Sequence, residues 1–360
     1  MFVACGFSYT APAVTLRPTL LFALIAACSS PIVEVPDSGT TEEDAGLDAG
    51  MEVVDAGPPD AGARAICPRD GGWVHLAPMP GPRSEVAVAA LNGEVYVLGG
   101  YDSRNLVVDT VQAYSWQTNT WRPRMRLPRP VSHLNVFAYD GKLWGLGSLD
   151  PSFRALPDTW RYDPATDQWD GLSNMPMGTE RGGSGVGIVN GKLVVAGGYR
   201  FGAVRDVSMY DPATDMWTPL PQLPAARDHL VAGVLGNTFF AIGGRRGPID
   251  GRVDALTLGE TAWVSKTAML TPRAGAAAAQ VGNVVIVAGG EGNLARADGI
   301  FPEVEAYDLV TDSWTSMPSW PTERHGTGGA TIDGVAFFPV GAIREGLGAV
   351  GANEAWCPPQ

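Results

Sequence analysis

A tyrosine and a tryptophan, seven residues apart, recur along this chain at nearly constant spacing. The pairs are Tyr114 and Trp121, Tyr162 and Trp169, Tyr210 and Trp217, and Tyr307 and Trp314. Leu256 and Trp263 keep the same spacing, and successive tryptophans stand 48, 48, 46 and 51 residues apart. A repeat of roughly 40–50 residues that carries several strands is typical of a β-propeller, because one repeat cannot bury its own faces.

Each repeat contains signals for short strands joined by tight turns, most clearly in residues 190–217. Asn190-Gly191 is a type I′ hairpin dipeptide, since both residues tolerate a positive φ. An apolar run follows and ends in a glycine pair, and the segment DPATD turns the chain before the tryptophan. The repeat region has no long stretch of helical periodicity, so we expect an all-β fold.

The glycine doublet, the spaced tyrosine and the tryptophan resemble the kelch motif. The doublets are Gly99-Gly100, Gly197-Gly198, Gly243-Gly244 and Gly289-Gly290, with Gly147-Ser148 as a degenerate copy and Gly341 alone in the last repeat. The resemblance covers residues 69–358 and implies a propeller. It says little about activity, because propellers carry many functions.

Six tight turns predict six blades in residues 67–360. The turns are Asn92-Gly93, Asp140-Gly141, Asn190-Gly191, Gly236-Asn237, Gly282-Asn283 and Asp333-Gly334. The last repeat has no outer-strand tryptophan downstream, so we expect Gly72 to Leu76 to supply its missing strand and close the ring.

Ring closure brings two cysteines near each other. Cys67 precedes the N-terminal strand, and Cys357 follows the strand that it would pair with. In an oxidising compartment a disulfide is expected; the alternative is two unrelated thiols.

The N-terminus carries export signals. Residues 19–27 form an apolar run that is too short to span a bilayer, and Leu24 to Cys28 resembles a bacterial lipobox. We expect a signal peptide over residues 1–27 and lipidation of Cys28, and Ser29 favours delivery to the outer membrane. An ordinary cleaved signal is the alternative. Residues 28–66, with nine acids, one arginine and four DAG triplets, are expected to form a disordered tether rather than a calcium site.

Charge limits the partners. The formal net charge is −13, and we find no basic patch or RNA motif, so nucleic acid is not expected as a partner. We expect a monomer that contacts a membrane through its lipid and binds an unknown protein or glycan.

Six arginines stand where the innermost strands should begin. They are Arg83, Arg129, Arg181, Arg227, Arg273 and Arg324. On the face with the long loops they could bind a carboxylate, a sulfate or an acidic peptide, and this makes them the candidate ligand-binding residues. The alternative is a structural role, in which each arginine pairs with a neighbouring acid or carbonyl.

No metal site and no cofactor are predicted. Three of the four histidines, His133, His229 and His325, follow an inner-strand arginine closely, and they are expected to line the channel without fixed metal-ligand spacing. The kelch copper oxidases need a tyrosine cross-linked to a cysteine, and no cysteine remains here for that. Motifs such as GxSxG, HExxH and the P-loop are not found.

These observations favour an exported, outer-membrane-anchored binding module without catalytic residues. A second hypothesis is an enzyme that resembles the kelch sugar-acid mutarotases, using an inner-ring arginine with Glu85 or Glu323. A third is a purely structural envelope protein. An exposed aromatic cluster on the long-loop face, for example Tyr101, Tyr199, Phe201, Phe301 and Trp320, would favour binding.

Overall fold

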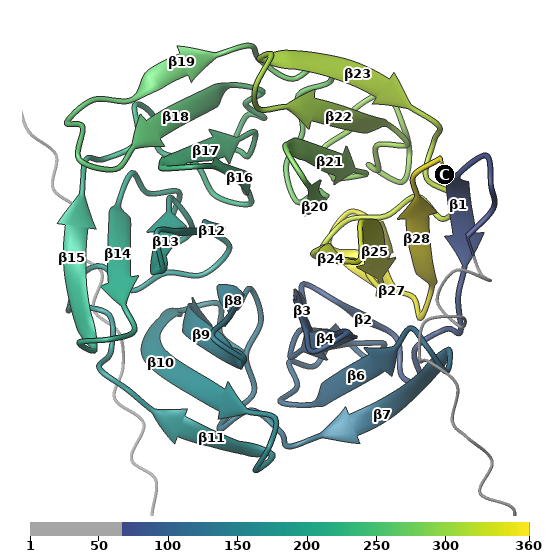
Figure 1. Ribbon diagram of the computed structural model, residues 1–360, viewed down its shortest axis with the longest axis horizontal. Helices are drawn as coiled ribbons and strands as arrows, with labels where there is room; N and C mark the ends of the chain where they lie inside the picture. Colours follow the sequence, from purple (N-terminus) through teal and green to yellow (C-terminus); the bar gives the residue numbers. More distant parts are fainter. Residues whose placement is uncertain (1–66, 360) are drawn as a thin grey trace, which may run out of the picture. The chain divides into compact units, whose positions relative to one another are not determined.

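The computed structural model describes residues 67–359, in which six four-stranded antiparallel sheets surround a central axis (Figure 1). Each sheet is one blade, with its first strand nearest the axis. The predicted all-β, six-bladed propeller is confirmed. The predicted signal peptide, the lipidated Cys28 and the tether over residues 28–66 lie outside the described residues. Within residues 67–359, no helix is long and apolar enough to cross a membrane.

The strands of the first three blades, from the axis outward, have the following bounds. Blade 1 is β3 (Ala87–Leu91), β4 (Glu94–Leu98), β6 (Val111–Ser115) and β7 (Thr120–Arg124); blade 2 is β8 (Val136–Tyr139), β9 (Lys142–Leu149), β10 (Ala155–Asp163) and β11 (Gln168–Gly171); blade 3 is β12 (Gly185–Val189), β13 (Lys192–Ala196), β14 (Val207–Asp211) and β15 (Met216–Leu220).

The other three blades follow the same order. Blade 4 is β16 (Val231–Leu235), β17 (Thr238–Ile242), β18 (Val253–Thr257) and β19 (Val264–Lys266); blade 5 is β20 (Ala277–Val281), β21 (Val284–Ala288), β22 (Val304–Asp308) and β23 (Ser313–Met317); blade 6 is β24 (Ala330–Ile332), β25 (Val335–Pro339), β28 (Asn353–Cys357) and β1 (Gly72–His75). Two short pairs, β2 (Arg83–Ser84) with β5 (Tyr101–Asp102) and β26 (Ala342–Arg344) with β27 (Leu347–Ala349), lie outside the blades.

The ring closes as the sequence predicts. Strand β1 pairs with β28 in antiparallel register, Gly72 opposite Cys357 and His75 opposite Glu354. Cys67 and Cys357 form the expected disulfide, with their Cα atoms 5.6 Å apart across a sequence separation of 290 residues. The first and last segments of the propeller are therefore joined by a strand pair and a covalent bond.

The recurring tyrosine and tryptophan of each blade help to bind the backbone of the segment that leads into the first strand of that blade. In blade 3, Trp217 Nε1 donates to the Ser173 carbonyl at 2.9 Å, and the Ser173 amide donates to Asp215 Oδ1 at 3.0 Å. The Tyr210 hydroxyl donates to the same Asp215 oxygen at 2.6 Å. The motif therefore forms hydrogen bonds with both the N–H and the C=O of one residue in the segment that leads into the blade, which we call the entering residue. We call this arrangement the outer clamp.

The outer clamp varies in step with the sequence. In blades 4 and 6, Trp263 and Trp73 donate to the carbonyls of Pro221 and Pro318. Proline has no N–H to donate. Blade 4, whose entering residue is a proline, also has Leu256 in place of the tyrosine. The missing tyrosine thus coincides with an entering residue that needs no acceptor for its amide.

The glycine doublets allow neighbouring blades to approach closely. A Cβ atom on Gly289 would come within 2.1 Å of the Arg324 carbonyl oxygen in the next blade. The amide of Gly290 donates to that same carbonyl at 3.0 Å. The doublet is therefore a contact between blades as well as a turn.

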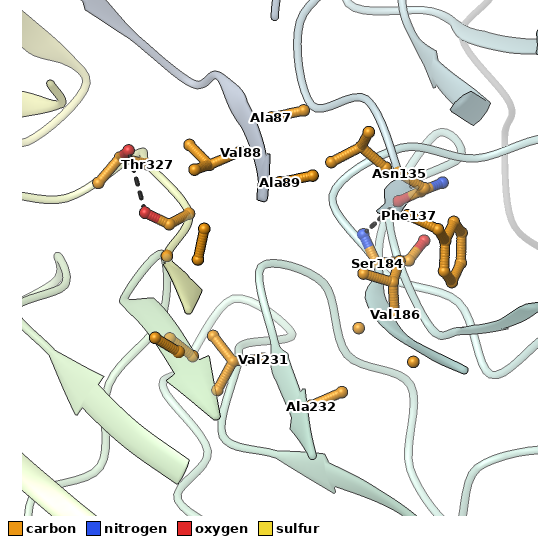
Figure 2. A pocket seen from close by; sticks show the side chains of 18 of the residues that line it. Ala87, Val88, Ala89, Asn135, Phe137, Ser184, Val186, Val231, Ala232 and Thr327 are labelled. Carbon is orange, nitrogen blue, oxygen red and sulfur yellow. Dashed lines mark hydrogen bonds between the residues drawn. The ribbon is translucent and has the colours of Figure 1, made fainter. Parts of the chain in front are cut away.

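Small residues of the inner strands surround a cavity of about 580 Å³ at the axis. Figure 2 shows Ala87, Ala89, Val186 and Ala232 around it. Part of this composition is required by packing, since a Cβ atom on Gly187 would lie 2.7 Å from Val234 Cγ2. The remaining space stays open between the inner strands.

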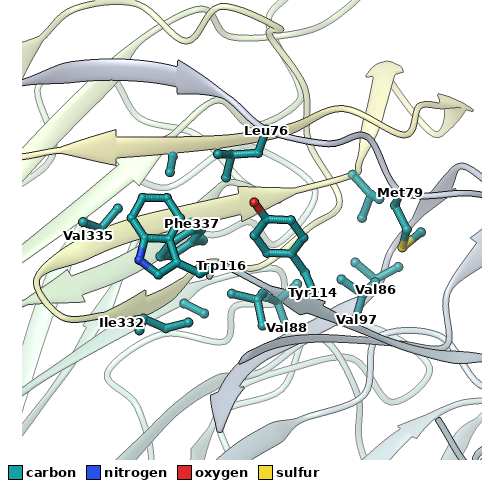
Figure 3. Close-up of a cluster of buried hydrophobic side chains, with 14 of the residues drawn as sticks. Leu76, Met79, Val86, Val88, Val97, Tyr114, Trp116, Ile332, Val335 and Phe337 are labelled. Carbon is teal, nitrogen blue, oxygen red and sulfur yellow. The ribbon is translucent and has the colours of Figure 1, made fainter. Parts of the chain in front are cut away.

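Blades pack against each other through apolar side chains, and the closing contact is of the same kind. Tyr114 and Val97 of blade 1 meet Phe337 and Val335 of blade 6, with Trp116 against Phe337 at 5.0 Å between ring centroids (Figure 3). The junction where the two ends of the propeller meet is thus packed like a domain core.

Candidate functional site

Six residues, one from each blade, form a ring of backbone at the axis. Their φ angles are all left-handed: Glu85 51°, His133 53°, Gly183 62°, His229 52°, Gly275 62° and Gly326 65°. Each amide from His133 to Gly326 donates to the carbonyl of the preceding ring member at 2.9–3.1 Å, and the Val86 amide closes the ring on Gly326 at 3.4 Å. We call this the axial ring.

Three members of the axial ring bear side chains, and these converge. His133 Nε2 lies 3.0 Å from Glu85 Oε2 and 3.0 Å from His229 Nε2. The side chains of Glu85, His133 and His229 are 15%, 4% and 6% exposed. Three ionisable groups from three blades thus share one small volume, at the end of the axial cavity that they help to line.

The backbone conformation at these three positions costs free energy. A left-handed φ at a residue with a Cβ atom costs about 1–2 kcal/mol, whereas glycine adopts it freely. The other three positions of the axial ring are glycines, Gly183, Gly275 and Gly326, which adopt the same φ without this cost. Strained residues occur at functional sites, although several Asn and Asp residues in the turns share this φ. Glu85, His133 and His229 are also ionisable groups that converge at the axis, and this combination makes them the strongest candidates for function in the propeller.

A network of charged groups surrounds the three side chains. His325 Nε2 lies 3.4 Å from Glu85 Oε1 and 3.1 Å from Glu291 Oε2. Arg245 contacts Glu291 at 2.6 Å and Asp228 at 3.3 Å, and Asp228 contacts His229 Nδ1 at 2.6 Å. Each carboxylate is thus held by at least one nitrogen, which orients the groups around the axis.

The network shifts two pKa values in opposite directions. Burial alone would raise the pKa of the Glu85 carboxyl, but the charges and hydrogen bonds of His133 and His325 hold that pKa well below its ordinary value. Burial alone would lower the pKa of His325, but its hydrogen bond and charge interaction with Glu85, together with Glu291, raise that pKa. Glu85 is therefore a carboxylate over a wide pH range.

Five of the six predicted arginines lie inside the blades. The buried residues are Arg83, Arg181, Arg227, Arg273 and Arg324. Their guanidinium groups donate to carbonyl oxygens of their own blades; Arg181, for example, donates to Gly197 and Val195 at 2.9 and 2.8 Å. Arg227, Arg273 and Arg324 also contact Asp254, Glu305 and Glu354 at 2.6–2.8 Å. These contacts correspond to the structural role left open by the sequence.

Arg129 is not the counterpart of the other five. The Gly100 amide donates to the Val131 carbonyl in the way that the Gly198 amide donates to the Arg227 carbonyl. Valine therefore takes the arginine position in blade 2, and placing Arg129 there was wrong by two residues. Arg129 is exposed and lies 3.6 Å from Asp158. Among the described residues that line the axial cavity, none is one of the six arginines.

The long loops carry exposed apolar side chains on the face where the axial ring lies. Five of the six loops between second and third strands each present one, and these are Leu106, Phe153, Phe201, Leu294 and Ile343. Phe153 also packs edge-on against His133, with 5.2 Å between ring centroids, and against Tyr199 at 4.8 Å. An apolar rim thus surrounds a charged centre, and we call these five residues the loop rim.

The aromatic cluster suggested by the sequence is only partly present. Phe201 is exposed, and Tyr101 and Tyr199 are half-buried. Phe301 and Trp320 are buried, and Trp320 stacks on the Arg324 guanidinium at 3.9 Å from its ring centroid. Including these two residues was wrong, because they pack within the blades.

Sequence reasoning did not identify the axial ring, although a simple offset marks most of it. In five blades the ring residue stands two positions after the buried arginine, as Glu85 after Arg83 and His229 after Arg227. Blade 2 lacks that marker because Val131 replaces the arginine. His75, the fourth histidine, lies away from the axis on β1, 3.3 Å from Glu354.

Family comparisons agree with the fold. A model described as the KLHDC2/KLHL20/DRC7 Kelch-repeats domain matches residues 73–244, and the Kelch motif matches residues 272–319. The chain belongs to the kelch-repeat β-propeller proteins.

Several known proteins are similar to this chain. Kelch-like protein terF of Aspergillus terreus is 31% identical over 298 residues, which cover 77% of this chain and 65% of that protein. Human Kelch-like protein 33 is 30% identical over 31% of this chain and 20% of its own length. A solved structure titled "Structure of YjhT" matches with a TM-score of 0.65 at 18% identity, covering 77% of this chain and 95% of the other. At that identity the likeness shows the fold alone.

Proposed function

We propose that this protein is an exported, lipid-anchored binding module that holds a protein or glycan ligand on the long-loop face of its propeller. The loop rim is the observation that carries the proposal. Large apolar side chains that recur on one face of a rigid scaffold mark interaction surfaces, and loops on such scaffolds commonly provide the contacts. The charged groups of the axial ring lie at the centre of the rim, where they would add specificity.

The opposite face supplies matched control positions. Met216 and Val310 are also exposed, at 61% and 60%. Met216 is the first residue of β15, directly after the turn between the third and fourth strands of blade 3, and Val310 lies in the corresponding turn of blade 5. Those turns lie at the other end of the blades from the loop rim. A change at these positions alters exposed apolar area without touching the proposed binding face.

The binding proposal is tested with a glycan array and with cross-linking pull-down from the native envelope. Phe201→Ser combined with Leu294→Ser is expected to abolish capture of the ligand, while Met216→Ser combined with Val310→Ser retains it. Equal capture by both double variants would refute the loop rim as the binding surface.

The anchor is supported by the apolar run over residues 19–27 followed by Cys28. The acidic segment over residues 28–66 would then separate the propeller from the membrane surface. Detergent partitioning tests this: wild type should enter the detergent phase, and Cys28→Ala should stay in the aqueous phase. Detergent partitioning of Cys28→Ala would exclude a lipid on that cysteine.

Catalysis on sugar acids is the alternative, and the described contacts support it less. Of the two glutamates considered, Glu85 lies at the axis, whereas Glu323 pairs with Arg296 at 2.7 Å. Arg83 is buried within its blade, and Arg245 already contacts Asp228 and Glu291. A sugar-acid carboxylate would have to compete for these cations. Mutarotation of a sugar acid by wild type, lost in Glu85→Gln, would establish the alternative.

A further inference from the structure

We infer that Glu85, His133 and His229 bind one divalent transition-metal ion at the propeller axis. Each residue offers one ligand atom, and these atoms all lie within 4.8 Å of one another. A tetrahedral zinc ion holds nitrogen and oxygen ligands at about 2.0–2.2 Å, which places those ligands about 3.3 Å apart. The separations from His133 Nε2 to His229 Nε2 and to Glu85 Oε2 are both 3.0 Å and would widen slightly on metal binding. The separation between the ligand atoms of Glu85 and His229, which is within 4.8 Å, would have to adjust to about 3.3 Å.

The remaining atoms of the three side chains are held in the way that metal ligands are commonly held. His229 Nδ1 lies 2.6 Å from the Asp228 carboxylate, and His133 Nδ1 lies 3.0 Å from Ser132 Oγ. A hydrogen bond from Nδ1 fixes the ring and leaves the lone pair of Nε2 for a metal. His325 contacts Glu85 Oε1, which leaves Oε2 facing the two imidazoles.

The backbone supports the same assignment independently. The axial ring is glycine in three blades, and the three blades that depart from glycine are those that supply the ligands. Gly326 also makes room for the carboxylate, since a Cβ atom there would lie 2.4 Å from Glu85 Oε1. Glycine at all six positions would allow the same backbone hydrogen bonds at no conformational cost. The presence of Glu85, His133 and His229 therefore indicates a role beyond closing the axial ring.

Charge and access fit a cation. Glu85 contacts His133 and Asp228 contacts His229, while Glu291 contacts Arg245 and His325. Arg245 is the nearest permanent cation; its Nη2 lies 3.5 Å from His229 Nε2, so this side chain must turn away when a metal binds there. Gly183 places no side chain beside the cluster; a Cβ atom there would lie 3.5 Å from His133 Cδ2 and 3.8 Å from His229 Cε1. The cavity of about 580 Å³ begins at this point and provides room for a water or a ligand at the remaining coordination position. Two imidazoles with one carboxylate suit Zn²⁺, Fe²⁺ or Co²⁺ rather than Ca²⁺ or Mg²⁺.

The full chain, stripped with a chelator and desalted, should bind one equivalent of Zn²⁺ in calorimetric titration. Co²⁺ should give visible absorption of a four- or five-coordinate centre, and Zn²⁺ should raise the melting temperature. These readouts need no ligand for the loop rim, so failure of the metal site and failure of the proposed function are distinguishable.

His133→Gly and His229→Gly test the ligands with little risk to folding, since glycine occupies the same ring position in three blades. Each variant should bind Zn²⁺ about 100-fold or more weakly, because losing a ligand costs more than losing its outer partner. Glu85→Gln should weaken binding while keeping the side-chain shape. His75→Ala, at an exposed histidine on β1, should bind as wild type does. No zinc binding by wild type, or unchanged binding by His229→Gly, would overturn the inference.

Discussion

A buried guanidinium group can satisfy several strand-end carbonyls at once. Arg273 donates to the Thr271 and Val287 carbonyls and to Glu305 Oε2 at 2.7, 2.9 and 2.8 Å. Five donors in a rigid planar fork make arginine suited to this position, and lysine could not replace its geometry. Burial lowers the pKa of Arg83 and Arg181 to about 10, so both remain charged at neutral pH. The buried arginines thus join the strands within five of the six blades.

Replacing Arg273 with methionine should destabilise the propeller by about 3–5 kcal/mol, because Glu305 would remain as a buried carboxylate without its partner. Urea unfolding at pH 7 measures the loss. The double variant Arg273→Met, Glu305→Leu removes both charges and should recover much of it. If the free energy of unfolding of Arg273→Met lay within about 1 kcal/mol of the wild-type value, close to the effect of an ordinary surface substitution, this account would be contradicted.

At the scale of elements, the outer clamp explains why tyrosine, aspartate and tryptophan recur together. The aspartate adopts a left-handed φ of 55° at Asp215 and accepts hydrogen bonds from the tyrosine and from the entering strand segment. Blade 1 uses Asn119 in the same place, with Tyr114 and Ala77 as donors. The acceptor is therefore required, while its charge is not.

The clamp carries a pH dependence. Desolvation alone would raise the pKa of Asp215, but hydrogen bonds from Tyr210 and Ser173 lower it. A lowered folded-state pKa stabilises the protein above the unfolded value of about 3.9 and loses that contribution as pH falls through the folded value. As the pH falls from about 5 to about 3, through the unfolded pKa, the free energy of unfolding of Asp215→Asn should decrease less than that of wild type, as measured by urea unfolding. That of Asn119→Asp should decrease more, and identical acid profiles for all three proteins would contradict the assignment.

On the scale of the whole molecule, stability depends on the closing junction in blade 6. Strand β1 comes from the start of the propeller, and its neighbour β28 comes from the end. Tyr114, Trp116 and Phe337 pack across the same junction (Figure 3). Opening it would expose an apolar surface and two strand edges, so the ring should unfold cooperatively.

Removing the disulfide should lower the melting temperature in oxidising buffer. Closing a loop of 290 residues stabilises a chain by about 5 kcal/mol in the entropy model. Cys67→Ser should therefore melt lower than wild type without reductant, and both should melt alike with dithiothreitol. Equal melting of the two proteins in oxidising buffer would show that the bond contributes nothing.

The sequence alone determined the number of blades, the closure by residues 72–76 and the disulfide. The blade number and the closure follow from local turn chemistry and a repeat period, both of which can be recognised along the chain. The disulfide was expected from that closure together with an oxidising compartment, and the structure contains it. The burial of Arg181 and the meeting of His133 with His229, 96 residues apart, were decided only by the tertiary structure. Side-chain direction at the axis depends on a left-handed backbone and on six strand starts converging from separate blades, and neither leaves a fixed spacing in the chain.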